Sequence, residues 1–132
     1  MRTICFFICG DTPNIDWYKN PIFKQKNIDV ILCTTMSEVF EKSFLKPYFA
    51  IISSDYLPET NTVGSKKYIA GDILIALDKL RISSYVILKE PENIEGEIDW
   101  IFFSIQRKTN TIERPFPEIV QEDEWLFRAT ET

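Results

Sequence analysis

The run from Tyr48 to Pro58, YFAIISSDYLP, constrains the fold of this chain more than any other segment. Its first half is apolar with two isoleucines at its centre, which is typical of a strand buried on both faces of a parallel sheet. Its second half turns polar at Ser53, Ser54 and Asp55. An apolar strand with a polar tip is what an open α/β sheet presents at its carboxyl edge, where functional sites form. The sequence therefore predicts a buried central strand whose tip belongs to a candidate site.

Further strands and helices are predicted to alternate around this central strand. The other strands are expected at Thr3–Cys9, Ile28–Cys33, Ser84–Leu88 and Thr109–Glu113. The helices are expected to end near Lys26, to follow Thr35, and to span Ser65–Arg81, Ile94–Arg107 and Glu118–Ala129. Such alternation predicts a doubly wound parallel sheet of five strands, in a single domain that covers residues 1–132.

Local signals support two of these helices. Thr35-Met36-Ser37-Glu38 matches a capping box, in which Thr35 is the N-cap and Glu38 reaches back to the backbone. The helix that follows is expected to bury Val39, Phe40 and Phe44.

Ile98, Ile101 and Ile105 are spaced as on one face of a helix, although the segment resembles a strand in composition. A parallel strand after Leu88 also needs a crossover of about a dozen residues or more. We therefore expect a helix here and place the fifth strand after it, at Thr109–Glu113.

Composition and charge exclude several classes of function. The net charge of −5 argues against a nucleic-acid partner, which requires a basic surface. No apolar run approaches the roughly 20 residues of a membrane span. The absence of histidine rules out His-based acid/base catalysis and His-containing metal sites. Cys5, Cys9 and Cys33 are odd in number and lack CxxC spacing, so we expect reduced, buried thiols in a cytoplasmic protein.

Four short motifs then suggest a family. Asp11-Thr12-Pro13 follows the first strand, Ser54–Pro58 follows the third, Gly71–Leu77 lies in the third helix, and Arg114-Pro115-Phe116 closes the fifth strand. In these landmarks the chain resembles the receiver domain of bacterial response regulators over essentially its whole length. The resemblance implies a flavodoxin-like topology with strand order 2-1-3-4-5.

The positions that carry chemistry in receivers depart from the family pattern. In that family an acidic pair and an aspartate hold Mg²⁺, the aspartate accepts a phosphoryl group, and a Thr/Ser and a lysine bind the phosphoryl oxygens. The corresponding residues here are Gly10 and Asp11 for the pair, Ser54 for the acceptor, Lys89 for the Thr/Ser, Arg114 for the lysine and Thr111 for an aromatic switch residue.

These departures remove what phosphorylation requires. A neutral hydroxyl with no general base is a poor acceptor, and a hard divalent cation needs two or three carboxylates. We therefore expect no catalysis, no metal and no other cofactor. The chain is predicted to be a phosphorylation-independent pseudo-receiver, a regulatory module that acts through protein contacts.

Three alternatives stay open at this point. Asp55 becomes the phosphoryl acceptor if the strand ends early and turns this side chain into the cleft; otherwise it is a turn residue. Lys89 and Arg114, with the serine hydroxyls, could bind a nucleotide phosphate and make the protein a sensor of small anions. Lys89 could instead pair with Asp11 or extend into solvent. A nucleotide- or NAD-processing enzyme would need a cleft carboxylate, and nothing marks the available Glu59 and Asp72 as one.

Aromatic residues on the last two predicted helices suggest an interface. Trp100 and Phe103 flank the apolar stripe of the fourth helix, and Trp125 lies beside an apolar pair in the fifth. In receivers the face formed by the fourth helix, the fifth strand and the fifth helix commonly makes dimer or output contacts. The resemblance implies a homodimer or another protein partner on the same face. The open alternative is that these rings cover a sheet edge within the molecule.

Overall fold

Strands and helices alternate along the residues that the computed structural model describes, which are 2–10 and 16–113, with side chains to Arg107. The elements are β1 (Thr3–Ile8), η1 (Trp17–Lys19), α1 (Ile22–Gln25), β2 (Ile28–Cys33), α2 (Met36–Lys42), η2 (Ser43–Leu45), β3 (Phe49–Ile52), β4 (Tyr56–Pro58), β5 (Lys67–Ile69), α3 (Ala70–Lys79), β6 (Ser83–Val86) and α4 (Ile94–Glu113). The chain forms two compact units, residues 1–97 and residues 98–132.

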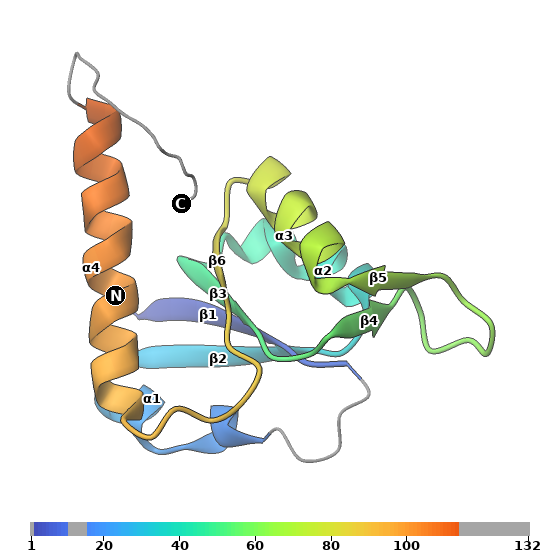
Figure 1. Cartoon of the computed structure of the whole chain (residues 1–132), viewed down its shortest axis with the longest axis horizontal. Helices are drawn as coiled ribbons and strands as arrows, with labels where there is room; N and C mark the ends of the chain where they lie inside the picture. Colours follow the sequence, from blue (N-terminus) through green and yellow to red (C-terminus); the bar gives the residue numbers. More distant parts are fainter. Residues whose placement is uncertain (1, 11–15, 114–132) are drawn as a thin grey trace. The chain divides into compact units, whose positions relative to one another are not determined.

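The first unit is built on a parallel sheet of four strands in the order β2-β1-β3-β6 (Figure 1). The register places Ile8, the last residue of β1, opposite Cys33 on β2 and Ile52 on β3, and Ile52 is opposite Val86 on β6. All four strands therefore end level at one carboxyl edge. The α/β class and the predicted order of these four strands are confirmed.

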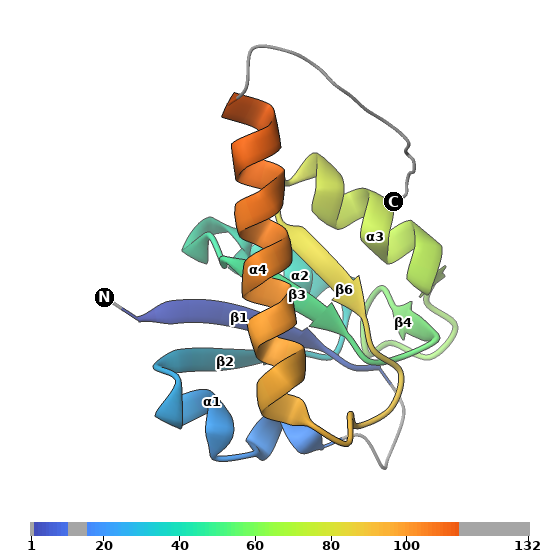
Figure 2. The ribbon, with the colours of Figure 1, turned by 60° about the vertical axis from the view of Figure 1, so that its left-hand side comes forward.

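Helices cover both faces of this sheet. Figure 2 shows α1 beside β2 and α3 beside β6. α2 and α3 contribute Val39, Ile73 and Leu77 to a core cluster that also contains Phe6 and Ile52 of the sheet. On the opposite face the Phe7 ring packs edge-on against Trp17 of η1, with ring centroids 4.9 Å apart. Burial on both faces explains the uninterrupted apolar runs of β3 and of the second half of β1. The outer strands β2 and β6 are only partly buried.

A two-stranded antiparallel hairpin, β4–β5, follows the central strand and was not predicted. Its register pairs Leu57 with Tyr68, and Leu57 is fully buried in the core cluster. Because Lys67–Ile69 are taken up by β5, the helix predicted over Ser65–Arg81 begins only at Ala70. Gly64 turns the loop of the hairpin with a φ of 82°, a conformation that favours glycine.

The capping box of α2 is confirmed with one change. The Thr35 Oγ1 accepts a hydrogen bond from the Glu38 N–H at 3.1 Å. The Glu38 Oε1 in turn accepts from the backbone N–H of Thr34 at 2.7 Å, one residue before the N-cap. Of the three residues expected to be buried by this helix, only Val39 is; Phe40 and Phe44 are 46% and 73% exposed, so the prediction for both was wrong.

α4 confirms the helix predicted from Ile94 and continues beyond Arg107 to Glu113. The strand predicted at Thr109–Glu113 is therefore wrong, and the sheet has no fifth strand among the described residues. Extending an existing helix adds one hydrogen bond per residue without a new nucleation step, which outweighs the weak strand preference of two threonines. The predicted final helix, Glu118–Ala129, lies outside the described residues. Within the described ranges, no helix has the length and apolar character needed to cross a membrane.

Candidate functional site

The polar tip of β3 is closed by hydrogen bonds to the main chain. Ser53 and Ser54 are 0% and 2% exposed. The Ser53 Oγ donates to the carbonyl oxygen of Ile87 at 2.9 Å, and the Ser54 Oγ donates to the carbonyl oxygen of Tyr56 at 2.7 Å. Both hydroxyl protons are thus directed at backbone acceptors, which satisfies the buried groups. In these two bonds the acceptor is a backbone carbonyl and not a side-chain base, which is what activation as a nucleophile would require.

Gly10, which follows β1, lies close to the main chain of Tyr56. A Cβ at this position would lie 2.5 Å from the Tyr56 carbonyl oxygen and 3.2 Å from the Ser54 Oγ. A real Cβ does not come that close to a backbone atom, so no side chain fits there without movement of β4. The start of the hairpin fills the space that a larger residue at position 10 would need.

Asp55 has an exposed side chain, and its backbone carbonyl accepts a hydrogen bond from the Ala70 N–H at 2.9 Å. This bond ties the tip of β3 to the start of α3. Within the described residues, no cluster of three or more Cys, Asp and Glu side chains could hold a metal ion.

Of the remaining residues of the predicted site, the two that the structure describes, Lys89 and Thr111, do not join this group. Lys89 is exposed and forms no ion pair with any other described residue, as in the alternative that extends it into solvent. Thr111 was expected on a strand beside the site, and it lies instead in α4. Asp11 and Arg114 lie outside the described residues. Among the described residues, the structure therefore brings together Gly10, Ser54 and the backbone of Asp55, but not Lys89.

Of the three predicted interface residues, the structure describes two. Trp100 and Phe103 lie on α4, and each is 55% exposed. The Arg107 guanidinium lies 5.7 Å from the centre of the Phe103 ring, which is a cation–π distance. Trp125 lies outside the described residues.

A polar hollow at the carboxyl edge is the main feature that the sequence did not predict. It has a volume of about 610 Å³. Its lining residues come from the ends of β1 and β2 and from the hairpin: Gly10, Thr34, Pro58, Thr60, Asn61, Thr62, Gly64, Ser65 and Lys67. The available signal was the hydroxyl-rich stretch after Pro58. Without the flanking strands it is indistinguishable from an ordinary polar loop.

The hairpin loop that forms one wall of the hollow is internally ordered. The Ser65 Oγ donates to the Thr60 carbonyl oxygen at 3.0 Å, and the Thr60 Oγ1 accepts from the Thr62 N–H at 3.2 Å. The Glu59 carbonyl oxygen accepts from the Ser37 N–H at 3.0 Å, which anchors the hairpin to α2. The wall is thus attached to the body of the first unit at its base.

Two ionisable groups near this edge, the Cys33 thiol and the Glu38 carboxyl, have pKa values shifted in opposite directions. Burial raises the pKa of the Cys33 thiol to about 11, an effect that Glu38 adds to and Lys42 opposes. Burial alone would also raise the pKa of Glu38, but hydrogen bonds from Thr34, together with the Lys42 charge, lower it overall. At neutral pH the thiol is therefore protonated and unreactive, whereas Glu38 is a carboxylate that orients the Thr34 side chain.

No family model matches the chain, and no curated protein or solved structure shows significant similarity to it. The fold and the edge together define an α/β protein with a parallel four-stranded sheet, a closed polar tip on its central strand and a polar hollow beside that tip.

Proposed function

We propose that the protein is a receiver-like regulatory module, of flavodoxin-like topology, that works without phosphorylation and acts by binding a protein. The observation that carries this proposal is the closed acceptor position. Ser54 stands where a receiver has its phosphoryl-accepting aspartate, and its hydroxyl is buried and donates to the Tyr56 carbonyl oxygen. The same carbonyl occupies the space of a side chain at Gly10.

Two physical requirements of phosphoryl acceptance are missing at this position. The acceptor must be an open carboxylate, and Ser54 is a hydroxyl buried under the hairpin. Mg²⁺ must be held by several oxygen ligands, and position 10, half of the acidic pair in the family pattern, has no room for a carboxylate. A module built this way keeps the sheet and its surfaces but not the switch chemistry.

The surface on α4 supports a function through protein contacts. Trp100 and Phe103 are both more than half exposed, and large aromatic rings are the commonest anchors of protein interfaces. Glu97, Asp99 and Arg107 of the same helix provide charged neighbours, as at the rim of an interface. We assign the partner surface to this helix.

The test is exposure of the whole protein to acetyl phosphate, and separately to beryllofluoride, each with Mg²⁺. The expected result is no phosphoryl mass on the intact chain and no change in the melting temperature, because the Ser54 hydroxyl at the acceptor position is buried and bonded to the main chain. A receiver with an intact acidic pair serves as the positive control for the reagents. A stoichiometric phosphoryl group that disappears in Asp55→Asn would overturn the proposal and make the protein a genuine receiver with Asp55 as its acceptor.

A further inference from the structure

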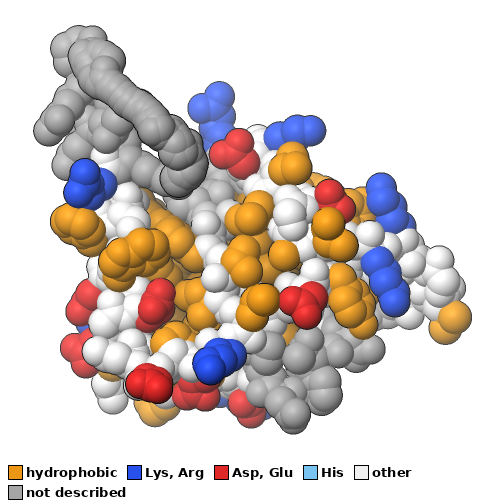
Figure 3. Space-filling model, viewed as in Figure 1, with side chains coloured by type: hydrophobic (Ala, Val, Ile, Leu, Met, Phe, Trp, Pro, Cys, Tyr) orange, Lys and Arg blue, Asp and Glu red, His pale blue; other side chains and the backbone are white. Residues whose placement is uncertain are grey.

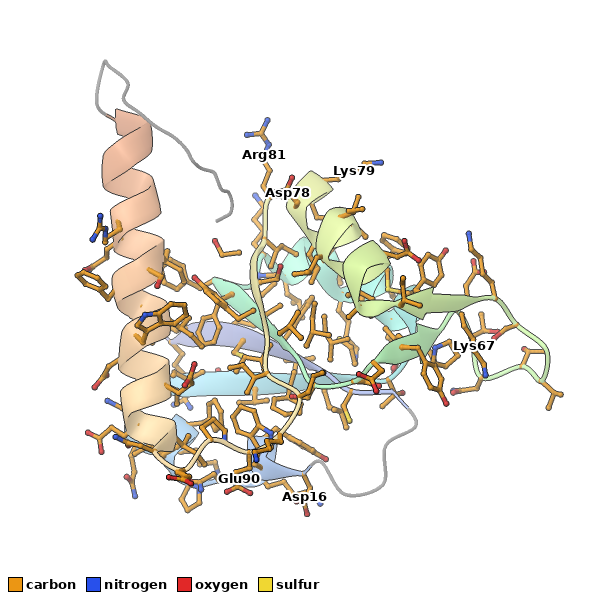
Figure 4. All side chains as sticks on the ribbon, in the orientation of Figure 1. Asp16, Lys67, Asp78, Lys79, Arg81 and Glu90 are labelled. Carbon is orange, nitrogen blue, oxygen red and sulfur yellow. The ribbon has the colours of Figure 1, made fainter. Side chains whose placement is uncertain are left out.

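The hollow at the carboxyl edge differs in charge from the rest of the molecule. The chain carries a net charge of −5, yet none of the described residues that line the hollow is acidic, and the charged one among them is Lys67. Figure 4 shows Lys67 on the hairpin, well separated from the charged residues Asp78, Lys79 and Arg81 at the far end of α3. Among the described residues, the side chains that line the hollow thus carry one positive charge and no negative charge, and the Glu38 carboxylate behind Thr34 is taken up by hydrogen bonds from the Thr34 N–H and hydroxyl.

From this geometry we propose that the hollow binds a small organic phosphate, with the phosphate group on Lys67 and the polar body of the ligand along the hairpin loop. A lysine ammonium is a common phosphate ligand because it is a compact charge with three donors. The volume of about 610 Å³ lies within the usual range for small-molecule sites. The position matches the rule that open parallel sheets bind ligands outside the carboxyl ends of their strands.

The hydrogen-bonding state of the lining residues supports an anionic ligand. The Thr60 Oγ1 accepts a bond from the Thr62 N–H, so its own proton remains available to donate. The Asn61 amide and the Thr62 hydroxyl make no side-chain hydrogen bond to another described residue. With Lys67, these groups offer several donors and no carboxylate, which suits phosphate oxygens and ligand hydroxyls.

Lys67 is also held in place from one side. Its ammonium lies 4.8 Å from the centre of the Tyr56 ring, and its residue pairs with Pro58 across the hairpin. The neighbouring Lys66 makes an equivalent contact, 4.9 Å from the centre of the Tyr68 ring, but it does not line the hollow. The two lysines therefore have similar surroundings, but of the two only Lys67 lines the hollow, which makes Lys66 a matched control.

The experiment is a titration of the ¹⁵N-labelled protein at neutral pH, followed through its backbone amide signals. The ligands are adenosine monophosphate, glucose 6-phosphate, orthophosphate and, as the uncharged control, adenosine. We expect saturable shifts at Gly10 and in the Thr60–Lys67 loop with the two organic phosphates. Lys67→Gln should weaken their binding about tenfold, the loss of one charge-assisted hydrogen bond, while Lys66→Gln changes it less than about twofold.

Three outcomes would each overturn the inference. The first is the absence of shifts with either organic phosphate up to about 10 mM, a concentration that detects even millimolar affinity. The second is an equal loss of affinity in the Lys67 and Lys66 variants. The third is binding of adenosine or orthophosphate as tight as that of the organic phosphates. The amide spectrum of each variant shows directly whether it is folded. Because none of these ligands is an activated phosphoryl donor, the result is independent of whether Asp55 can be phosphorylated.

Discussion

Gly10 and Gly71 are each followed by an aspartate in the sequence, but their surroundings are opposite. A Cβ on Gly10 would collide with the Tyr56 carbonyl oxygen, whereas a Cβ on Gly71, in the first turn of α3, has no atom within 4 Å. We expect Gly10→Ala to destabilise the protein by about 1–3 kcal/mol, as overpacking does. Gly71→Ala should stabilise it by up to about 1 kcal/mol because alanine favours a helix. Urea unfolding of both variants measures the two free energies.

The same pair of variants also tests the closed tip of β3. If Gly10→Ala proved as stable as the wild type, the Tyr56 main chain would have to move at little cost. The main-chain contact that closes the acceptor position at Ser54 would then be easy to displace, and this position could open. A loss in both variants would instead show that the effect at Gly10 does not come from its close contact with the hairpin.

At this scale the sequence predicted that Gly10 and the two serines lie together, but not which hydrogen bonds the serines make. The apolar run before Ser53 was enough to place both serines at the carboxyl edge, beside Gly10. The acceptors of their hydroxyls, the carbonyls of Ile87 and Tyr56, belong to segments that reach the tip only through the tertiary fold. Lys67 was missed for the same reason, since its role depends on the hairpin that turns it back toward β1.

Among the elements, α2 provides a test through pH. In the folded protein the pKa of Glu38 is lowered by hydrogen bonds from Thr34 and by Lys42, against the opposing effect of burial. A carboxyl group whose folded pKa is below its unfolded value stabilises the protein above the unfolded value, and the effect is lost as pH falls through the folded one. The free energy of unfolding should therefore decrease as the pH drops below the ordinary value of 4.5.

The variant Glu38→Gln isolates this contribution, because glutamine can also accept hydrogen bonds at this capping position but does not titrate. Its unfolding free energy, measured by denaturant titration from neutral pH to pH values below 4.5, should fall less steeply than that of the wild type. Glu41→Gln, an exposed carboxylate of the same helix, is the matched control. Equal slopes for Glu38→Gln and the wild type would contradict the role assigned to Glu38.

Strands marked by an apolar run were predictable, and elements determined by neighbours were not. The strands around Phe6, Val30 and Tyr85 were placed to within two residues at either end, because a short apolar run bounded by turn signals is typical of a strand. The β4–β5 hairpin was missed because each strand has only three residues. Such short strands are set by pairing and by the burial of Leu57 rather than by local preference. The extension of α4 through Thr109–Glu113 was missed because the alternation of strands and helices called for a fifth strand after the helix predicted over Ile94–Arg107.

At the scale of the whole molecule, several elements expose large apolar side chains. Figure 3 shows hydrophobic side chains gathered over α3 and β6, where Ile75 and Val86 are 57% and 41% exposed. On α4 the exposed rings are Trp100 and Phe103. Contiguous apolar surface of this kind marks interaction sites more often than isolated exposed residues do.

If α4 carries the interface of a homodimer, the protein should associate reversibly, with a mass that rises with concentration. Trp100→Ala combined with Phe103→Ala should shift it to a monomer, because the variant loses two aromatic anchors while alanine preserves the helix. Sedimentation equilibrium measures the mass, and circular dichroism checks the fold. Ile75→Ala, an equally exposed change on another helix, should leave association unchanged. A wild type that stays monomeric at about 100 µM would rule out a dimer of ordinary affinity.

The burial of the three cysteines also makes the protein a reporter of its own internal opening. Cys5 lies within β1, Cys9 follows its end and Cys33 closes β2, and none is more than 5% exposed. An alkylating reagent attacks the thiolate, and these thiols are free of disulfides. Each sulfur can therefore be modified only after a local opening that admits reagent and water to its part of the sheet. The alkylation rate of each cysteine thus measures how often its part of the sheet opens, and no label has to be introduced.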